Sequence, residues 1–381
     1  MEDPSSMKAS LTNETTGASF DRPLARPPAM TAVAERSSSL VRDGLNMTPW
    51  SEGLPMWRAS LAQFPGASFY HCEPWIEALR GSYAIDFEVA TLHRQNELRA
   101  AAVFARSKKL FSTRLVSIPF SDCGEPLAID DESRADFMRA LISSNQAGSI
   151  EIRGAAGPEP WKNVDCFGHW TLDLRRPLAE INAALSRTVR SGIKRATKEK
   201  VQIDCGTDAS YVARFYDLQL ETRRRLGVPP QPFKFFATVH EKFAPGNDFE
   251  VWFARFEGRD HAGLVLLRSG DQLCYKWGAR IENGHPGANH LLVSKMIEAH
   301  AGKAASMDFG RCDMRNQGLV RSKADLGCVS RPLPYAFFPT APRNISSEVL
   351  SGPANVVSAV WKRLPLPVTR VLGEALYRYM A

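Results

Sequence analysis

The stretch Phe87–Arg106, FEVATLHRQNELRAAAVFAR, decides the fold, because a similar stretch recurs at Phe249–Arg268 as FEVWFARFEGRDHAGLVLLR. The two align without a gap and share six identical residues. Each consists of an apolar strand, a polar turn and a second apolar strand, which is typical of a β-hairpin. The segments Ser149–Ile152 and Ser306–Phe309 predict one more strand at a similar distance after each hairpin. We therefore expect one α/β unit to be present twice, with a cleft between the copies in which two substrates can meet.

The composition is that of a soluble globular protein, with 44% hydrophobic and 23% charged residues. A length of 381 residues is enough for about two ordinary domains. The formal net charge of +7 suggests an anionic partner, such as a phosphate, a nucleotide, tRNA or an acidic membrane surface. General solubility explains the same charge.

The seven cysteines are scattered singly and form no C-x-x-C pair. The sequence therefore predicts neither a zinc site nor a disulfide framework, and we expect no metal. A reducing cytoplasm fits this cysteine usage. The sequence has no run of 18 apolar residues, so no transmembrane helix is expected. We predict a cytoplasmic protein.

Four segments are expected along the chain. Residues 1–45 are rich in Ser, Thr, Pro and Ala and are predicted to be disordered. Residues 46–175 and 176–340 each form one α/β domain, and residues 341–381 form a basic amphipathic tail of two helices that break at Leu364–Pro367. The tail either lies on the inner face of an anionic membrane, as a peripheral contact, or packs back on the second domain.

A helix predicted from Ala179 to Lys200 carries a cationic stripe. On a helical wheel, Arg187, Arg190, Lys194 and Lys198 fall on one side and the apolar residues on the other. No acid at i+4 spacing compensates this stripe before the end of the helix, so an anion is a reasonable partner. Arginine suits a phosphate or a carboxylate because its guanidinium donates two parallel hydrogen bonds. The alternative is a basic face that only meets solvent.

A loop containing Gly284, Pro286 and Gly287 opens directly into a predicted helix at Asn289 and His290. The start of a helix presents free N–H groups and the positive end of the helix dipole, which suit a phosphate. We expect Asn289 to be the N-cap, a role that is compatible with anion binding. His290 lies near the same predicted site, although a lone histidine is more often structural. The loop matches neither a Walker loop nor a dinucleotide fingerprint.

The third candidate region begins at Asp308, on a short strand that is followed by Gly310, Arg311, Asn316 and Lys323. A carboxylate at the carboxyl end of a strand lies where open α/β sheets place their sites. Asp308 either holds an amine or orients Arg311. The alternative is an ion pair with Arg311 or Lys323 that only fixes the loop. The chain contains no G-x-S-x-G and no H-E-x-x-H. We therefore expect chemistry that depends on positioning rather than on a covalent intermediate.

These segments resemble the Fem-like branch of the GNAT superfamily, over about residues 60–340. Its members are tandem acyltransferases related to the peptidoglycan interpeptide-bridge enzymes and to proteins linked to polysaccharide or exosortase loci. The most specific pieces of the resemblance are Leu115–Asp122, Arg187–Ala196, Leu226–Pro229 and Asp308–Arg311 with Lys323 and Gly327. The tail segment Trp361–Pro367 also resembles that of exosortase-linked members.

The resemblance implies an α/β (α+β) fold with two tandem GNAT-like domains, each a mixed, mostly antiparallel sheet flanked by helices. It also implies an N-acyltransferase that moves an acyl group from a carrier to an amine of an amino sugar or of a cell-envelope or polysaccharide precursor. Acyl-CoA is the favoured co-substrate, and no tightly bound cofactor is expected. The implied catalytic residues are Asp308, Tyr275 and Lys323, and the implied binding residues are Arg187, Arg190, Lys194, Asn289, His290, Arg311 and Asn316.

The sequence departs from the ordinary GNAT pattern in the pyrophosphate loop, which is reduced to Gly284–Ala288. Three hypotheses therefore stand. The first is the acyl-CoA-dependent transferase, which the Asp308–Arg311 segment favours. The second is a tRNA-dependent aminoacyltransferase, whose donor the net charge can help to hold, although the helical arm of some bridge enzymes is not evident. The third, which the reduced loop favours, is a GNAT-fold binding protein without turnover.

Overall fold

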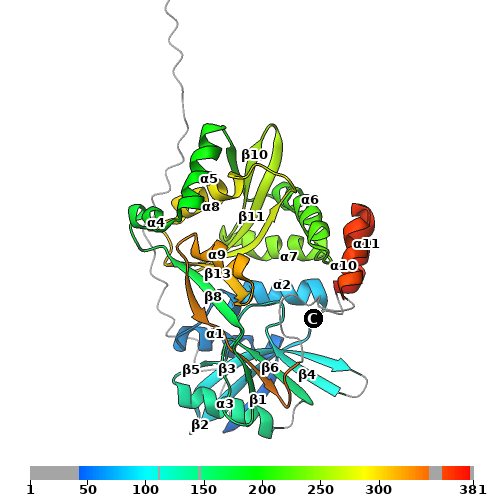
Figure 1. The fold of residues 1–381 in the computed structure, drawn as a ribbon. Helices are drawn as coiled ribbons and strands as arrows, with labels where there is room; N and C mark the ends of the chain where they lie inside the picture. Colours follow the sequence, from blue (N-terminus) through cyan, green and yellow to red (C-terminus); the bar gives the residue numbers. More distant parts are fainter. Residues whose placement is uncertain (1–42, 110–111, 145–146, 343–353, 378–381) are drawn as a thin grey trace, which may run out of the picture. The chain divides into compact units, whose positions relative to one another are not determined.

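The computed structural model describes residues 43–109, 112–144, 147–342 and 354–377 (Figure 1). The segment predicted to be disordered, residues 1–45, lies outside the described residues except for its last three. Two of these, Gly44 and Leu45, begin the first strand. The described residues belong to one compact unit of the chain.

The first sheet has eight strands, with the order β1-β2-β3-β4-β6-β15-β7 and with β5 paired to β3. Strands β4 and β6 are parallel, and the other pairs are antiparallel. The strands are β1 (Gly44–Pro49), β2 (Phe87–Arg94), β3 (Glu97–Lys109), β4 (Ser112–Ser117), β5 (Leu127–Ala128), β6 (Ser149–Arg153), β7 (Lys162–Val164) and β15 (Tyr335–Phe338).

The second sheet has seven strands, with the order β9-β10-β11-β12-β13-β8-β14, and only β12 and β13 are parallel. Its strand order and its parallel pair correspond to those of the first sheet at each of the seven positions. The predicted pair of mixed, mostly antiparallel sheets is therefore confirmed. The strands are β8 (Phe167–Asp173), β9 (Gln202–Gly206), β10 (Phe249–Phe256), β11 (Arg259–Ser269), β12 (Gln272–Arg280), β13 (Ser306–Asp313) and β14 (Val329–Pro332).

The two repeated stretches form hairpins with the same backbone geometry. In each, the first residue of the first strand pairs with the ninth residue of the second, and a bulge follows the sixth residue of the first strand. The turns are Gln95–Asn96 and Glu257–Gly258, and all four residues have positive φ, between 50° and 74°. Two-residue turns of this type match the twist of the strands that they join.

The chain exchanges one strand between the two sheets. Strand β8 precedes the other strands of the second sheet in sequence and pairs there with β13 and β14. Strand β15 follows all of them and returns to the first sheet, between β6 and β7 (Figure 1). The strands of the second sheet, β8 to β14, therefore follow one another in the chain, whereas the first sheet combines β1 to β7 with the late strand β15.

The helices cover the sheets and also lie between them. Those of the first half are α1 (Trp50–Gln63), α2 (Glu73–Tyr83) and α3 (Asp131–Ser143), with a 3₁₀ turn at Phe69–His71. Those of the second half are α4 (Leu178–Ala184), α5 (Arg187–Lys198), α6 (Ala209–Leu226), α7 (Phe233–Phe243), α8 (Ala288–His300) and α9 (Gln317–Ala324), with a 3₁₀ turn at Ala244–Gly246.

The prediction of a single helix over residues 179–200 is wrong, because α4 ends at Ala184 and a second helix, α5, begins at Arg187. Leu185 is buried with extended backbone, and the Ser186 hydroxyl accepts a hydrogen bond from the Val189 N–H, which caps α5. The buried Leu185 side chain and the capping Ser186 hydroxyl both stabilise the start of a new helix at this point.

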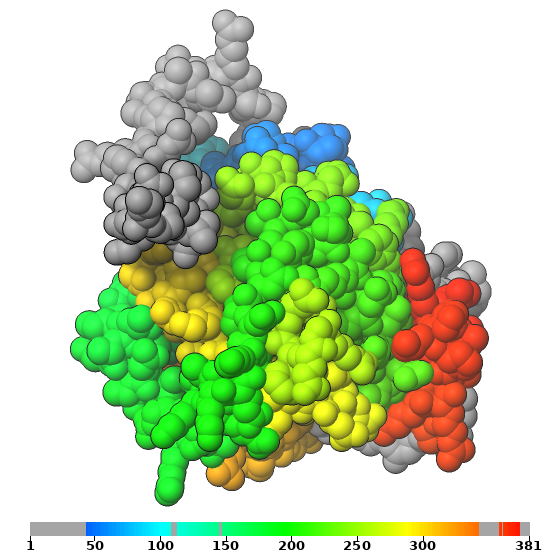
Figure 2. Space-filling view, turned by 90° about the horizontal axis from the view of Figure 1, so that it is seen from above, coloured from blue at the N-terminus to red at the C-terminus, as the bar shows by residue number. Residues whose placement is uncertain are grey.

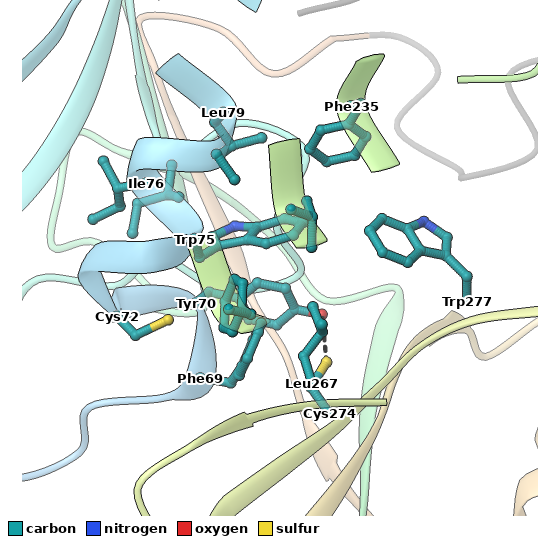
Figure 3. Close-up of a cluster of buried hydrophobic side chains, with 14 of the residues drawn as sticks. Phe69, Tyr70, Cys72, Trp75, Ile76, Leu79, Phe235, Leu267, Cys274 and Trp277 are labelled. Carbon is teal, nitrogen blue, oxygen red and sulfur yellow. Dashed lines mark hydrogen bonds between the residues drawn. The ribbon is translucent and has the colours of Figure 1, made fainter. Parts of the chain in front are cut away.

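One apolar core joins the two halves. Trp75 of α2, Phe235 of α7 and Trp277 of β12 are buried and in ring contact with one another (Figure 3). Two further apolar clusters fill the other faces of the sheets, under α3 and α8. The halves therefore share a core in addition to the exchanged strands.

The tail consists of α10 (Ala354–Arg363) and α11 (Leu366–Tyr377), which pack against α6 (Figure 2). Trp361 is buried, and the Arg370 guanidinium lies 5.6 Å from the centre of the Tyr216 ring. The alternative in which the tail packs back on the second half is therefore observed for the described tail residues. Contact with a membrane stays a prediction. In the described part of the chain, every helix is too short or too polar to cross a bilayer.

Candidate acyl-transfer site between the halves

The candidate site lies where two parallel strands part. Strands β12 and β13 pair only from Gln272–Cys274 to Ser306–Asp308. Beyond that point each strand is irregular: Lys276 is an extra residue opposite β11, and β13 shifts its register between Asp308 and Arg311. Bulges re-aim side chains and are frequent beside active sites.

The irregular segment of β13 is fixed from two sides. Gly310 has φ of 74°, and its N–H donates to Asp308 Oδ1 at 2.6 Å. The Lys323 ammonium donates to the carbonyl oxygens of Gly310 at 2.7 Å and Arg311 at 3.3 Å, and also to that of Phe309. A Cβ at position 310 would lie 2.8 Å from a carboxylate oxygen of Asp122, so only glycine fits.

Asp122 comes from the first half, on the loop that follows β4. Ile118 and Phe120 in this loop have φ of 32° and 60°, which is unfavourable for bulky and β-branched residues. Such strain persists where the surrounding structure enforces it, often at functional sites. The Asp122 carboxylate accepts hydrogen bonds from the Tyr70 hydroxyl at 2.9 Å and from the Arg311 N–H at 3.0 Å. The loop thus joins one half to the irregular strand of the other.

Lys276 supplies a second cation beside this carboxylate. Its ammonium lies 4.4 Å from the ring centres of both Tyr70 and Trp75, and 3.4 Å from the Tyr70 hydroxyl. Contact with the faces of aromatic rings stabilises a cation that is partly removed from water. Figure 3 shows the Tyr70 and Trp75 rings side by side, with the Tyr70 hydroxyl directed toward Cys274 of β12.

The charges in the site determine which groups ionise. Burial opposes ionisation of Asp122, but Lys276 and Arg311 outweigh it and hold the pKa of this carboxyl well below its usual range. Burial raises the pKa of the Tyr70 hydroxyl. At neutral pH the site therefore holds an anionic Asp122 and a neutral Tyr70.

Asp308 is buried and is held by a histidine. His169 of β8 lies with Nε2 at 2.8 Å from Asp308 Oδ1, and its Nδ1 accepts a hydrogen bond from Arg331 Nε at 3.2 Å. This pattern assigns the proton to Nε2. Burial alone would disfavour the charged imidazole, but the hydrogen bond to Asp308 raises the pKa of His169.

The three residues implied as catalytic lie together at the parting strands. Asp308 and Lys323 both hold the backbone around Gly310, and Tyr275 stacks on Phe309 with ring centres 5.5 Å apart. Burial raises the pKa of Tyr275 to about 12. The contacts of Asp308 and Lys323 are with protein groups, and their catalytic roles stay predictions.

Arg311 also belongs to this cluster. Its guanidinium donates to the Tyr335 hydroxyl at 2.7 Å and lies 3.5 Å from Asp122 Oδ1. Arg311 and Tyr335 line a cleft of about 500 Å³, together with Arg114 and Arg153. The cleft therefore borders this side of the cluster. Asn316, in contrast, caps α9: its side-chain oxygen accepts a hydrogen bond from the third residue of that helix, at 3.1 Å.

The three implied binding residues on α5 are exposed, as predicted. Arg190 is partly engaged, because it donates to the carbonyl oxygens of Ala183 at 3.2 Å and Leu185 at 2.6 Å, at the end of α4. Arg187 and Lys194 lie on the same exposed face. Their role in ligand binding stays a prediction.

Helix α8 packs on α5 at the reduced glycine loop. Gly287 lies against the Gly192 carbonyl of α5, too close for a side chain, and it caps α8, which begins at Ala288. The prediction that Asn289 is the N-cap is therefore wrong, because it lies one residue inside the helix. His290 is directed at Gly192, and its half-buried ring has no hydrogen-bond partner at Nδ1 among the described residues.

Asn289 lines a pocket of about 430 Å³ between this loop and the neighbouring strands, which we call the α8 pocket. Two cations line it, and Arg225 has a buried Nε without a hydrogen-bond partner in the described part of the chain. The lining residues are Arg225, His261, Ala262, Arg280, Ile281, Glu282, Asn283, Gly284, His285, Pro286, Ala288 and Asn289.

Sequence reasoning did not select Tyr70, Asp122, His169 and Lys276 as site residues. Asp122 had a signal, since it ends the segment Leu115–Asp122 that carries part of the family resemblance. The other three residues sit in ordinary strand or helix-start sequence. Within the described residues, no group of three or more His, Cys, Asp or Glu side chains is arranged to hold a metal ion.

Two like sheets, each with a parallel pair of strands joined through a helix, define a tandem protein of the GNAT type. Residues 183–317 match the family model described as an acetyltransferase (GNAT) domain. Residues 183–317 therefore match a GNAT-type acetyltransferase domain, and the chain has a Fem-like fold. No curated protein sequence matches the chain.

Solved structures show the same fold at low sequence identity. The crystal structure of FemX is 14% identical with a TM-score of 0.58, over 74% of this chain and 95% of that one. A conserved protein of unknown function from Bacteroides thetaiotaomicron is 10% identical with a TM-score of 0.51, over 74% and 96%.

Proposed function

We propose that the protein is an N-acyltransferase that moves an acyl group from acyl-CoA to the amine of an amino sugar or of another cell-envelope or polysaccharide precursor. The observation that carries this proposal is the parting of β12 and β13, which leaves Lys276 and the Arg311 N–H beside the Asp122 carboxylate. Opposite charges are thus held in place where the two strands separate.

This arrangement suits attack of an amine on an acyl carbonyl. The amine nitrogen bonds to the carbonyl carbon, the carbon–sulfur bond of the thioester breaks, and the thiol leaves with the proton that the amine loses. The anionic Asp122 would hold and orient the amine. Positive charge from Lys276 would stabilise the oxyanion, and fixed charge of this kind is usually the largest contribution to catalysis.

The α8 pocket suits the diphosphate of the donor. It combines the start of a helix with Arg225 and Arg280, and helix starts and guanidinium groups both bind phosphate oxygens. No acidic residue lies in the first turn of α8. Acyl-CoA therefore fits the donor role without a tightly bound cofactor.

The test is transfer of radiolabelled acetyl groups from acetyl-CoA to glucosamine by the full chain. Lys276→Met should lower kcat by about 10²- to 10³-fold, because it removes a charge at the reacting carbonyl. Lys295→Met is the matched control, since Lys295 is exposed on α8 and forms an ion pair with Glu298 on the same helix. Equal rates in wild type and Lys276→Met would contradict the role of Lys276.

A tRNA-dependent aminoacyltransferase is the second candidate, and the exposed cations of α5 favour it. Binding of bulk tRNA that weakens steeply between 50 and 200 mM salt, with no response to CoA, would support it. If neither CoA nor tRNA binds, a binding protein without turnover becomes the better description.

A further inference from the structure

The first half contains a counterpart of the α8 pocket, which we call the α3 pocket. It has a volume of about 550 Å³ and lies against the loop after β4, the start of α3 and the loop Gly154–Pro158 after β6. The α8 pocket lies against the loop after β12 and the start of α8. The two pockets therefore occupy matching places in the duplicated unit.

The start of α3 disfavours a phosphate. Asp130 caps the helix by accepting a hydrogen bond from the Ser133 N–H at 2.7 Å, and Asp131 and Glu132 occupy the first turn. Three carboxylates at this position repel an anion, and the capped N–H is already bonded. The α8 helix has no acid in its first turn.

The α3 pocket instead holds a carboxylate without a bonding partner. Glu125 lines the pocket, and its Oε2 is buried with no hydrogen-bond partner in the described part of the chain. The oxygen is so close to Gly154 that a Cβ there would lie 2.6 Å away. Burying an unpaired polar atom costs stability, so it is expected where a ligand supplies the partner.

The backbone around Glu125 is fixed. Its carbonyl oxygen lies 3.0 Å from His71 Nε2, and the Gly124 N–H donates to the Arg153 carbonyl at 3.0 Å. The side chain is thus aimed by a loop that is anchored on both sides.

The two arginines of the α3 pocket do not neutralise Glu125 by hydrogen bonds. Arg134 binds Asp131 at 2.5 Å and the Pro126 carbonyl at 3.3 Å. Arg331 donates from Nε to His169. Among the described residues, the buried atom without a partner in this pocket is an acceptor, Glu125 Oε2, whereas in the α8 pocket it is a donor, Arg225 Nε.

We propose that the α3 pocket binds the saccharide ring of the acceptor, with ring hydroxyls donating hydrogen bonds to Glu125. Glu125 follows Asp122 by three residues, so their backbones lie at most about 10 Å apart. A sugar held at Glu125 can therefore present an amine on its ring or a short substituent toward Asp122. This inference rests on the proposed function for the link to Asp122, but the binding chemistry of the pocket stands by itself.

The test is calorimetric titration of the full chain with glucosamine, glucose, ethanolamine and inorganic phosphate. We expect both sugars to bind and the other two probes to show no saturable binding. Glu125→Gln should weaken both sugars about tenfold, because a charge-assisted hydrogen bond is lost. Glu132→Gln is the matched control, since Glu132 is exposed in the first turn of α3 and does not line the pocket. Its affinities should equal those of the wild type.

Stability gives a second measurement. Glu125→Gln should not lower Tm, because it removes a carboxylate oxygen that has no partner. A lower Tm, unchanged sugar affinities in Glu125→Gln, absence of sugar binding by the wild type, or ethanolamine binding as tightly as glucosamine would each overturn the proposal. If both sugars bind as expected but no acetyl transfer is observed, only the proposed function is refuted.

Discussion

The two hairpins of the duplicated unit agree, whereas the two loops beyond them differ. Hairpins β2–β3 and β10–β11 share register, bulge position and turn geometry. The loop after β4 contains Asp122 and Glu125, and the pocket at the corresponding loop after β12 contains Arg225. Among the described residues, Glu125 Oε2 and Arg225 Nε are buried without a hydrogen-bond partner. Alternating apolar side chains are enough to keep a hairpin, so the framework can stay while the loops acquire different chemistry.

The largest expected effect comes from separating the halves between Arg175 and Arg176. Neither fragment should unfold cooperatively alone, because the first loses β15 from the interior of its sheet and the second loses β8. Circular dichroism melts of each fragment and of the mixture measure this. A cooperative melt of either fragment alone would show that its half is an independent domain.

Gly310→Ala compares the central site with a hairpin turn. The change should lower the free energy of unfolding by about 3 kcal/mol, from backbone strain and from the clash with Asp122. Gly258→Ala is the matched control: φ is again 74°, but a Cβ meets open space. It should cost about 1 kcal/mol. Equal losses in urea denaturation would mean that Asp122 and Gly310 move apart without cost.

Asp122→Asn tests the contact between the halves and its pH dependence. The folded-state pKa of Asp122 is lowered, so its contribution to stability is present above its unfolded pKa of about 3.9 and is lost as pH falls toward the folded value. At pH 7 we expect the free energy of unfolding of the wild type to be about 2 kcal/mol higher than that of the variant. This value is reduced because Asp122 is partly exposed. The difference should shrink toward pH 3 in urea melts, and a constant difference would contradict the assignment.

The smallest expected effect is on CoA affinity, when one arginine is removed from either of the two pockets. Arg225→Ala should weaken CoA binding about tenfold, or ~1.4 kcal/mol, by removing a cation from the α8 pocket. Arg134→Ala removes a cation from the α3 pocket and should leave CoA affinity unchanged. Calorimetry with CoA measures both. Equal weakening in the two variants would mean that CoA does not distinguish the pockets.

Local patterns predicted much of the framework. The hairpins, the strand at Asp308 and the helix after the reduced glycine loop are encoded by alternation, turn residues and apolar periodicity within a few residues. The break before α5 was missed, because Leu185 continues the helical apolar pattern but is buried with extended backbone. The N-cap was misplaced for a related reason: Gly287 is selected by its contact with Gly192, which no local pattern reports.

The central site could be predicted only in part. Asp308 and Arg311 lie in one segment and were selected together. Tyr70 and Asp122 come from distant parts of the first half and meet Lys276 only through a contact between the halves, so no local motif reports that they lie together. Bulges and strained loops are decided by such long-range contacts rather than by propensity.

The exchanged strand also fixes the order in which the protein can be completed during synthesis. Strand β15 ends at Phe338 and is the partner of both β6 and β7, which were made more than 150 residues earlier. The first sheet therefore cannot be completed until Phe338 has left the ribosome. Domains usually fold from the N-terminus as they emerge. Here the N-terminal sheet is completed only when β15 has been synthesised, because β6 and β7 both pair with that strand.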